Sequence, residues 1–376
     1  MEWSAPLPKR PQKGHDVSFK SNITTEVRRT MKHDNAKGDI VVLGIDLAKM
    51  SFQLHGVDKD GNVVLRKKLS RSKLSGLIAN LAPCLIGLEA CGGAHHWMRT
   101  FNEMGHTVRM MAPQFVKPYV KSNKNDAVDA EAICEAVQRP SMRFVPVKNI
   151  EQQDIQSLHR IRSQVVARRT ALANQIRGLL LEYGIVIPQG IGYVRKAIPG
   201  ILEDAENTLT PRFRELLSEL YDEMVHLDER VMTLEQKLEV VCAQSEECQR
   251  LLTIPGVGLL TATALVAAIG DITVFKNGRE LAAWLGLVPR QHSTGGKPTL
   301  MGISKRGDSY LRTLLIHGGR TVVRVAHKHQ DKRNRWVGEV EQRRGKNISA
   351  VAVANKNVRI AWALLSKKES YHAALA

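Results

Sequence analysis

The stretch Ile40-Val41-Val42-Leu43-Gly44-Ile45-Asp46 decides the fold of the N-terminal third. Its short run of β-branched and aliphatic residues is typical of a strand that is buried in a sheet. Asp46 lies within this apolar run, where a charge is costly unless another group pairs with it. The run therefore predicts a buried strand that carries one carboxylate for a purpose other than packing.

Strand and helix patterns continue on the C-terminal side of this run. Further strands are predicted over Phe52–Val57, Val63–Leu69, Cys84–Glu89 and Val108–Met111, the first two joined by a hairpin turn at Asp58–Asn62. Helices are predicted around Leu74–Leu81, around Trp97–Phe101 and over Asp126–Val137. The order predicts an α/β domain with a mixed central sheet over residues 39–148.

Four carboxylates stand where a metal site in this domain would need them: Asp46, Glu89, Asp126 and Asp129. Asp126 and Asp129 are three residues apart on a predicted helix and so share one face. Like charges that converge need a bound cation, and oxygen-only ligands select Mg²⁺ or Mn²⁺. Two such ions can hold the attacking and leaving oxygens of a phosphodiester. The alternative is separate surface acids, with Asp126 and Asp129 stabilising a helix N-terminus.

Two long helices are predicted in the middle of the chain, over residues 149–248. The first spans Glu151–Tyr183, the glycines and prolines of Gly184–Gly200 interrupt it, and the second begins after Pro211. From Leu217 to Val241 the apolar residues of the second helix alternate steps of three and four, which predicts a coiled coil. Two alternatives stay open: a seam between the chains of a dimer or tetramer, and a hairpin with the first helix.

The C-terminal part, residues 249–368, is predicted to be all-α and to begin with a helix-hairpin-helix. Pro255 stops one helix, and Gly256 and Gly258 permit a tight turn. The next helix then opens with free N–H groups that can hold a DNA phosphate without reading bases. The alternative is an ordinary tight turn between helices.

A segment rich in Gly, Ser and Lys follows between the predicted helices. Ser293 can attack phosphorus if a base or a metal ion activates its hydroxyl, and His292 is poorly placed for that because it is adjacent in sequence. Lys297, Lys305 and Arg306 can neutralise the phosphate. The alternative is that Ser293 is one of the serines common in turns.

Charge and composition point to a polyanionic partner. The net charge of the 376 residues is +18, and the sequence pI is about 9.8, as expected of a nucleic-acid-binding protein. Residues 1–38 are basic and predict either an arm that touches phosphates or a start-site artefact. No apolar run is long enough for a transmembrane helix, and no secretory signal is recognisable. The five cysteines form no C-x-x-C pair, so reduced thiols in a cytoplasmic protein are expected.

Two sets of motifs resemble one known family. Gly44-Ile45-Asp46, Glu89 after Gly87-Leu88, and Lys124-Asn125-Asp126-Ala127-Val128-Asp129-Ala130 resemble the DEDD tetrad of RuvC-like nucleases of the ribonuclease-H fold. The last motif is similar to the K-x-D-x-x-D-A of DEDD insertion-sequence transposases. Pro289–Lys297 and Ile303–Asp308 resemble the C-terminal serine domain of the same transposases.

The resemblance implies a recombinase that excises and inserts its own element. It places Ser293 as the nucleophile, with Thr294 as second choice, and implies a covalent phosphoserine and a free 3′ hydroxyl. The DEDD site with Mg²⁺ would then act on the same phosphate across a subunit boundary, and a structured non-coding bridge RNA would pair with target and donor DNA. Two rivals are a Holliday-junction nuclease, which forms no covalent intermediate, and a non-enzymatic DNA-binding protein.

Overall fold

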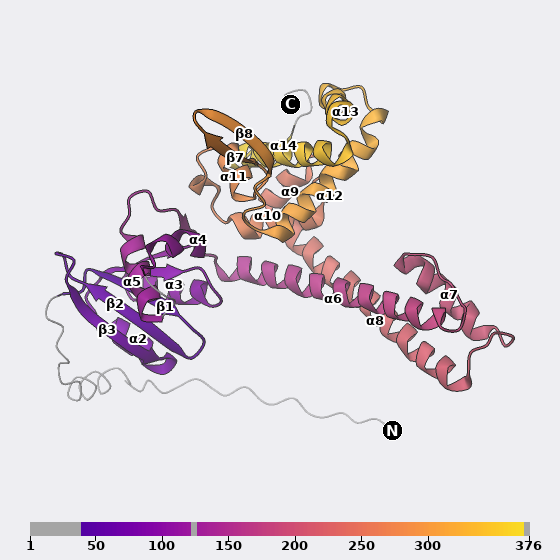
Figure 1. The fold of residues 1–376 in the computed structure, drawn as a ribbon, viewed down its shortest axis with the longest axis horizontal. Helices are drawn as coiled ribbons and strands as arrows, with labels where there is room; N and C mark the ends of the chain where they lie inside the picture. Colours follow the sequence, from indigo (N-terminus) through magenta and orange to yellow (C-terminus); the bar gives the residue numbers. More distant parts are fainter. Residues whose placement is uncertain (1–38, 122–125, 372–376) are drawn as a thin grey trace, which may run out of the picture. The chain divides into compact units, whose positions relative to one another are not determined.

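The computed structural model describes residues 39–121 and 126–371. The predicted basic arm, residues 1–38, and Lys124-Asn125 of the acidic motif lie outside these described residues. The chain divides into two units, Met1–Val145 and Pro146–Ala376, which we describe in turn (Figure 1).

A six-stranded mixed sheet forms the centre of the first unit. Its strands are β1 (Val42–Leu47), β2 (Ser51–Val57), β3 (Val63–Ser70), β4 (Leu85–Glu89), β5 (Thr107–Met111) and β6 (Phe144–Val145). Their order in the sheet is β3-β2-β1-β4-β5-β6. The β1–β4 and β4–β5 pairs are parallel, and the other three pairs are antiparallel. The predicted mixed α/β fold is confirmed. Strand β6 was not predicted, because its two residues are too short to form a recognisable pattern.

Helices cover the sheet. They are α2 (Arg71–Ala79), α3 (Ala94–Glu103), α4 (Pro113–Val116), the 3-10 turn η2 (Lys117–Tyr119) and α5 (Asp126–Val137). Helix α5 packs on β1, β2 and β4, and α3 packs on β4 and β5. Side chains alternate between the faces of a strand, and both Val42 and its neighbour Leu43 are buried. The first strand is therefore covered on both faces, as its continuous apolar run predicts.

Two long helices begin the second unit and pack against each other. They are α6 (Ile150–Leu181) and α8 (Pro211–Gln244). Arg162 Nε donates to Glu235 Oε1 over 2.9 Å, and Arg169 Nη1 donates to Asp228 Oδ1 over 2.8 Å. The later residue of α6, Arg169, pairs with the earlier residue of α8, Asp228, so the two helices run antiparallel.

The apolar stripe of α8 is buried inside this one chain. It packs with residues of α6 in a single core: Leu217, Met224, Leu227, Val231 and Leu234 from α8, with Leu172, Ile176 and Leu180 from α6. The intramolecular hairpin, one of the two predicted alternatives, accounts for the 3–4 pattern. A seam between chains along the same stripe would have to displace α6.

The interruption between the long helices is shorter than predicted. Helix α7 (Ile191–Glu203) occupies much of Gly184–Gly200 and contains Pro199. Val194 and Ile198 of α7 are fully buried in the core shared with α6 and α8. Tertiary packing of these two side chains overrides the weak helix propensity of the nearby glycines and proline.

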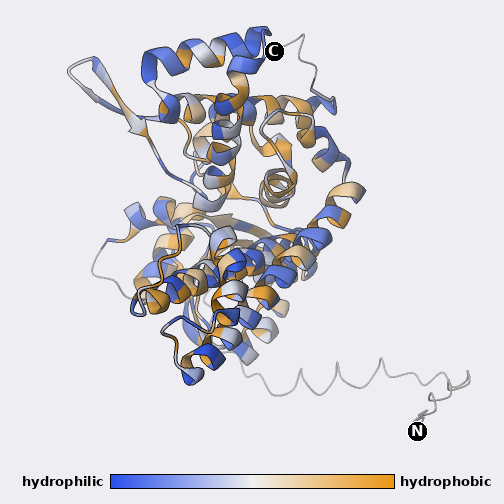
Figure 2. Ribbon diagram, turned by 90° about the vertical axis from the view of Figure 1, so that its right-hand side faces the viewer, coloured by the Kyte–Doolittle hydropathy of each residue, from blue (hydrophilic) through white to orange (hydrophobic). Residues whose placement is uncertain are grey.

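Shorter helices surround the core of the C-terminal part. They are α9 (Glu246–Leu252), α10 (Leu259–Ile269), η3 (Ile272–Val274), α11 (Gly278–Trp284), α12 (Ser309–Val325), η4 (Ala326–Lys328), α13 (Lys332–Arg344) and α14 (Lys346–Lys367). In Figure 2 their apolar residues line the interior and their polar residues the outside. Among the residues described, no helix has the length and apolar character needed to cross a bilayer.

The prediction of an all-α C-terminal part is wrong, because it contains a two-stranded hairpin. Strands β7 (Pro289–Thr294) and β8 (Lys297–Ile303) pair antiparallel. Gly295 and Gly296, with φ of 58° and 77°, form the two-residue turn between them. A two-residue type I′ turn, the kind whose twist matches that of the two strands it joins, needs positive φ angles at both residues. Glycine adopts such angles without strain. Nearly every residue of the two strands is exposed, so no alternation of buried and exposed positions marked the hairpin in the sequence.

A buried histidine ties α6 to the C-terminal helices. His159 is 4% exposed; its Nε2 lies 3.0 Å from Thr263 Oγ1, and its Nδ1 lies 3.0 Å from the Tyr310 hydroxyl. Thr263 Oγ1 donates its own proton to the Leu259 carbonyl over 2.8 Å. Thr263 therefore accepts from His159 Nε2–H, and Nδ1 accepts from Tyr310. Burial, and then the charge of Arg162, lower the pKa of His159 from 6.5 to about 4, so the imidazole is neutral.

Candidate active site

Three of the four predicted acidic residues converge at the carboxyl end of β1. Asp46 comes from β1, and Asp126 and Asp129 come from the first turn of α5. One carboxylate oxygen from each lies within 4.8 Å of the other two. Asp46 and Asp129 are half-buried, whereas Asp126 is exposed. The donor set consists of oxygen atoms alone, which fits hard divalent cations such as Mg²⁺.

A glycine in β1 brings these two elements together. A Cβ at Gly44 would lie 2.3 Å from the Ala130 carbonyl oxygen and 2.5 Å from the Cys134 amide nitrogen of α5. No larger residue fits without moving the helix, so β1 and α5 touch through their main chains. Gly87 in β4 also packs against α5, with more room: a Cβ there would lie 2.9 Å from Val137 Cβ and 3.1 Å from Ile133 Cγ2. The close approach sets the distance between Asp46 and the two aspartates of α5.

Glu89 lies near this cluster but outside the group of three. The parallel pairing of β1 and β4 runs up to Ile45 opposite Leu88, so Asp46 and Glu89 come next on their strands. Burial, followed by the negative charges of Glu89 and Asp46, raises the pKa of the Cys91 thiol. Both carboxylates are thus close to the same thiol. Glu89 therefore lies at the same end of the sheet as Asp46, and its part in a metal site stays a prediction.

The acids of α5 differ in whether protein cations neutralise them. Lys121 Nζ lies 3.2 Å from Glu135 Oε2, and Arg66 Nη2 lies 3.5 Å from Glu131 Oε2. In residues 39–121 and 126–371, no lysine or arginine forms an ion pair with Asp126 or Asp129. Within the described residues, the two aspartates of α5 that face Asp46 therefore have no lysine or arginine partner, and a bound metal ion would supply the positive charge.

Ser293 lies on β7, two residues before the glycine turn, and its side chain is exposed. Gln291 Nε2 donates to Ser293 Oγ over 2.8 Å. His292 and Thr294 are its neighbours on the strand, so their side chains point to the opposite face. An amide cannot take the serine proton, so Gln291 orients the hydroxyl and is no general base. This contact was not predicted from the sequence.

Close main-chain contacts fix the base of the hairpin. A Cβ at Gly286 would lie 2.0 Å from the Arg306 carbonyl oxygen, and one at Gly307 would lie 2.0 Å from that of Trp284. Lys305 N donates to the Gly286 carbonyl over 3.1 Å, and Lys305 itself has a φ of 54°, which is uncommon outside glycine. Lys305 and Arg306 are exposed on this fixed segment, and Lys297 is exposed at the start of β8.

The turn between α9 and α10 contains Pro255, Gly256 and Gly258. Gly256 has a φ of 87°, and a Cβ at Gly318 of α12 would lie 1.9 Å from the Gly256 carbonyl oxygen. Helix α10 begins after Gly258 and has no side-chain cap, which leaves its first N–H groups open. The turn is therefore held against α12 and leaves the uncapped start of α10 next to it.

Two buried polar side chains, both unforeseen from the sequence, hold this turn. Arg333 Nη2 and Asn357 Nδ2 each donate to the Pro255 carbonyl over 3.0 Å, and Arg333 Nη2 also donates to Asn357 Oδ1 over 2.6 Å. Arg333 is 4% exposed and Asn357 is 1% exposed. The Tyr371 ring covers the guanidinium at 5.5 Å.

Comparison with known proteins assigns the two parts of the chain separately. Residues 43–185, which carry the acidic cluster, match a DEDD transposase family of the IS110 type. Residues 248–335, which carry the turn and the serine hairpin, match the transposase IS116/IS110/IS902 family. The fold and the acidic site thus define a DEDD transposase, an enzyme that cleaves and transfers DNA.

Full-length relatives agree. The chain is 52% identical to a "Probable family 20 transposase" of Pseudomonas aeruginosa over 330 residues, 88% of this chain and 98% of the relative. It is 48% identical over 350 residues to the transposase for insertion sequence element IS1111A of Coxiella burnetii, which is 93% of this chain and 94% of that relative. It is 43% identical over 331 residues to the transposase for insertion sequence element IS1328 of Yersinia enterocolitica, which is 88% of this chain and 98% of that relative. The chain belongs to the IS110 family of transposases, and the non-enzymatic rival is wrong.

Proposed function

We propose that this transposase excises and inserts its insertion sequence through a covalent phosphoserine at Ser293, with the acidic cluster as its metal site. The observation that carries the proposal is the convergence of Asp46, Asp126 and Asp129 in a family of DNA-transferring enzymes. The exposed Ser293 in the second matched segment supplies the hydroxyl. Lys297, across the hairpin from Thr294, and Lys305 and Arg306, at the base of the hairpin, are the cations proposed to contact DNA phosphates. A junction-resolving nuclease would need no such hydroxyl.

The serine step balances as a transesterification. Ser293 Oγ attacks phosphorus and loses its proton, the bond from phosphorus to the 3′ oxygen breaks, and that oxygen leaves and takes up a proton. The products are a 5′-phosphoserine and a free 3′ hydroxyl. Gln291 holds Oγ by donating to it, which leaves the serine proton directed elsewhere.

Asp46, Asp126 and Asp129, with Glu89, would hold Mg²⁺ or Mn²⁺, which stabilises charge that develops on the phosphate oxygens. The contribution of the protein is a set of oxygen ligands whose spacing is fixed by Gly44. Asp126 and Asp129, being one helical turn apart, move as a unit.

Double-stranded DNA, at the element ends and at the target, is the proposed substrate. The turn Pro255–Gly258 and the open N-terminus of α10 would hold backbone phosphates as a helix-hairpin-helix does. Such contacts carry no base information, and the net charge of +18 exceeds what one turn can use. We therefore also propose the element-encoded guide RNA as the source of sequence specificity.

The arrangement is proposed to be a RuvC-like domain over residues 39–148, a helical spacer over 149–248 and a serine domain over 249–368. A homo-oligomer, dimer or tetramer, would let the acidic site and the serine come from different chains. Its interface would use surfaces other than the α8 stripe that α6 covers.

Covalent trapping tests the proposal. The protein, with its co-expressed flanking RNA, is incubated with end-labelled element-end DNA and Mg²⁺, and a denaturing gel shows whether label stays on the protein. We expect an adduct with the wild type and with Thr294→Ala, and none with Ser293→Ala. Thr294→Ala is the matched control because it removes the adjacent hydroxyl on the other face of β7. An adduct that survives in Ser293→Ala would refute the serine assignment.

The metal site has its own test. Asp46→Asn should abolish recombination and weaken Mn²⁺ binding, measured by calorimetry, while duplex binding stays within about twofold, because binding depends mainly on Lys and Arg contacts to phosphates. Glu131→Gln, on the neutralised part of α5, is the control. Unchanged Mn²⁺ affinity in Asp46→Asn would remove this cluster from the mechanism.

A further inference from the structure

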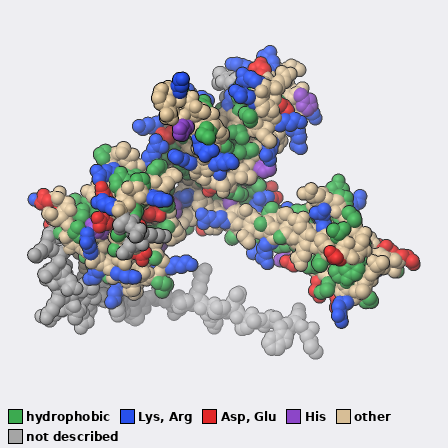
Figure 3. All heavy atoms as spheres, in the orientation of Figure 1, with side chains coloured by type: hydrophobic (Ala, Val, Ile, Leu, Met, Phe, Trp, Pro, Cys, Tyr) green, Lys and Arg blue, Asp and Glu red, His purple; other side chains and the backbone are tan. Residues whose placement is uncertain are grey.

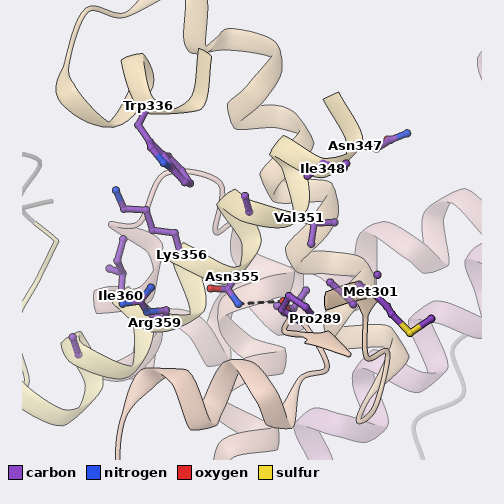
Figure 4. A pocket seen from close by; sticks show the side chains of 15 residues that line it. Pro289, Met301, Trp336, Asn347, Ile348, Val351, Asn355, Lys356, Arg359 and Ile360 are labelled. Carbon is purple, nitrogen blue, oxygen red and sulfur yellow. Dashed lines mark hydrogen bonds between the residues drawn. The ribbon is translucent and has the colours of Figure 1, made fainter. Parts of the chain in front are cut away.

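A hollow of about 1070 Å³ opens between the serine hairpin and the last long helix (Figure 4). Pro289 and Met301 line it from the hairpin, Trp336 lines it from α13, and Ile348 and Val351 line it from α14. Met301 and Ile348 are 51% and 54% exposed. The volume is that of a ligand pocket, and its lining is mainly apolar, as in most such pockets.

Cations without acidic partners border this hollow. Lys356 Nζ lies 4.7 Å from the centre of the Trp336 ring. Burial and then the positive charges of Arg333, Lys332 and Arg359 lower the pKa of Lys356, and no carboxylate opposes them. Figure 3 shows Lys and Arg side chains over the region of α13 and α14. Among residues 39–121 and 126–371, no ion pair involves a cation of these two helices.

An apolar hollow with an aromatic wall and a cationic border has the chemistry that recognises a nucleotide. A base can be buried against Trp336 while its phosphates meet Lys356 and Arg359. The amides of Asn347 and Asn355 lie at the walls. Asn355 Nδ2 donates to the Leu287 carbonyl over 3.1 Å, so Asn355 Oδ1 is an acceptor for a base edge, while Asn347 offers both a donor and an acceptor. A protein segment would satisfy the apolar lining and leave the cations without counter-charge.

We propose that this hollow takes one unstacked base of the DNA strand that Ser293 attacks. The proposal rests on the proposed function, since it uses Ser293 to locate the strand. Pro289 at the hollow and Ser293 are four residues apart on β7, which is about 13 Å along a strand. That length equals about four base-pair steps of duplex DNA. The extruded base therefore lies within about four nucleotides of the cleaved phosphate and opens the duplex beside it.

A binding preference for an unpaired base tests the proposal, because such a base is extruded at lower cost than a paired one. The probes are two labelled duplexes of equal length, one fully paired and one with a single unpaired adenine. We expect the wild type to bind the second about tenfold more tightly, as stacking of one base contributes. Met301→Asp, which puts a negative charge in the hollow, should bring the ratio to about one.

Leu300→Asp is the matched control. Leu300 precedes Met301 on β8, is 68% exposed, and points to the other face of the hairpin, away from the hollow. It introduces the same charge and should keep the tenfold preference. Ala352→Trp, which fills the hollow from α14, is a second variant that should also remove the preference.

The outcomes separate this proposal from the serine mechanism. Ser293→Ala should lose the covalent adduct and keep the preference for the unpaired adenine. A wild type without that preference, or a preference that survives both Met301→Asp and Ala352→Trp, overturns the base-binding hollow and leaves the serine mechanism intact. Equal weakening of both duplexes by Met301→Asp would also overturn it, because the effect would then be on general DNA binding.

Discussion

Replacing Gly44 by alanine is expected to separate the acidic cluster without touching any of its members. The new Cβ would lie 2.3 Å from the Ala130 carbonyl oxygen, where ordinary van der Waals contact begins at 3.4 Å. The two main chains must therefore move apart by about 1 Å, because interiors are close-packed and neighbouring atoms cannot absorb the overlap. Asp126 and Asp129, in the first turn of α5, move away from Asp46 with the helix.

Two magnitudes follow from this displacement. Overpacking of this kind reduces the free energy of unfolding by about 1–3 kcal/mol. A misplacement of about 1 Å in a catalytic group lowers the rate by about 100-fold. Gly44→Ala should therefore remain folded at 25 °C, lose about that stability in urea unfolding, and lose far more strand-cleavage activity and Mn²⁺ affinity than the stability loss accounts for.

Gly76→Ala is the matched control. Gly76 lies in α2 of the same unit, and a Cβ there would have no neighbour within 4 Å. The same substitution should stabilise the protein by about 0.5–1 kcal/mol, because glycine is a poor helix former. Activity and Mn²⁺ binding at the wild-type level in Gly44→Ala would refute the reasoning that close packing of β1 and α5 sets the metal site.

Two further predictions concern the second unit. The pKa of His159 is about 4 in the folded protein and 6.5 in the unfolded chain. Between these values the unfolded chain binds a proton that the folded protein does not, so the free energy of unfolding falls as the pH drops from about 6.5 toward 4. Urea unfolding should show a loss of about 2 kcal/mol at pH 5. His159→Gln should flatten that dependence, and an unchanged slope would contradict it. Asn357→Asp keeps an acceptor for Arg333 but loses the donor to the Pro255 carbonyl; it should weaken duplex binding and reduce the slope of log affinity against log salt by about one phosphate contact. An unchanged salt slope with lower stability would make Asn357 a structural residue only.

The N-terminal unit was predictable because its elements carry strong periodic signals. The buried run at β1 continues for several apolar residues, and Asp126–Val137 was predicted with the bounds that the helix has. The acids were predictable because a carboxylate inside an apolar run demands an explanation. The role of Gly44 was not, because a close approach of β1 and α5 depends on residues nearly ninety positions away along the chain, which no local pattern reveals.

The C-terminal part was harder to predict for two physical reasons. Every hairpin residue except the half-buried Ile303 is exposed, so no alternation of buried and exposed side chains marked the strands. The dipeptide Gly295-Gly296 was the available signal. Helix α13 is strongly polar and buries few residues, which hides its period. The contacts of Arg333 with the Pro255 carbonyl span 78 residues and follow only from the tertiary fold.

Neither half of the proposed active site is complete on its own. Among the residues that the structure describes, the hydrogen bond at Ser293 Oγ comes from Gln291, a donor that cannot accept the serine proton. The acidic cluster holds oxygen ligands and no nucleophile. A serine hydroxyl without a neighbouring base is a weak nucleophile, so Ser293 stays unreactive toward a phosphodiester until a second group activates it. The proposed serine step therefore needs a group other than Gln291 to take the proton, and the proposed mechanism assigns that activation to the metal bound by the acidic cluster.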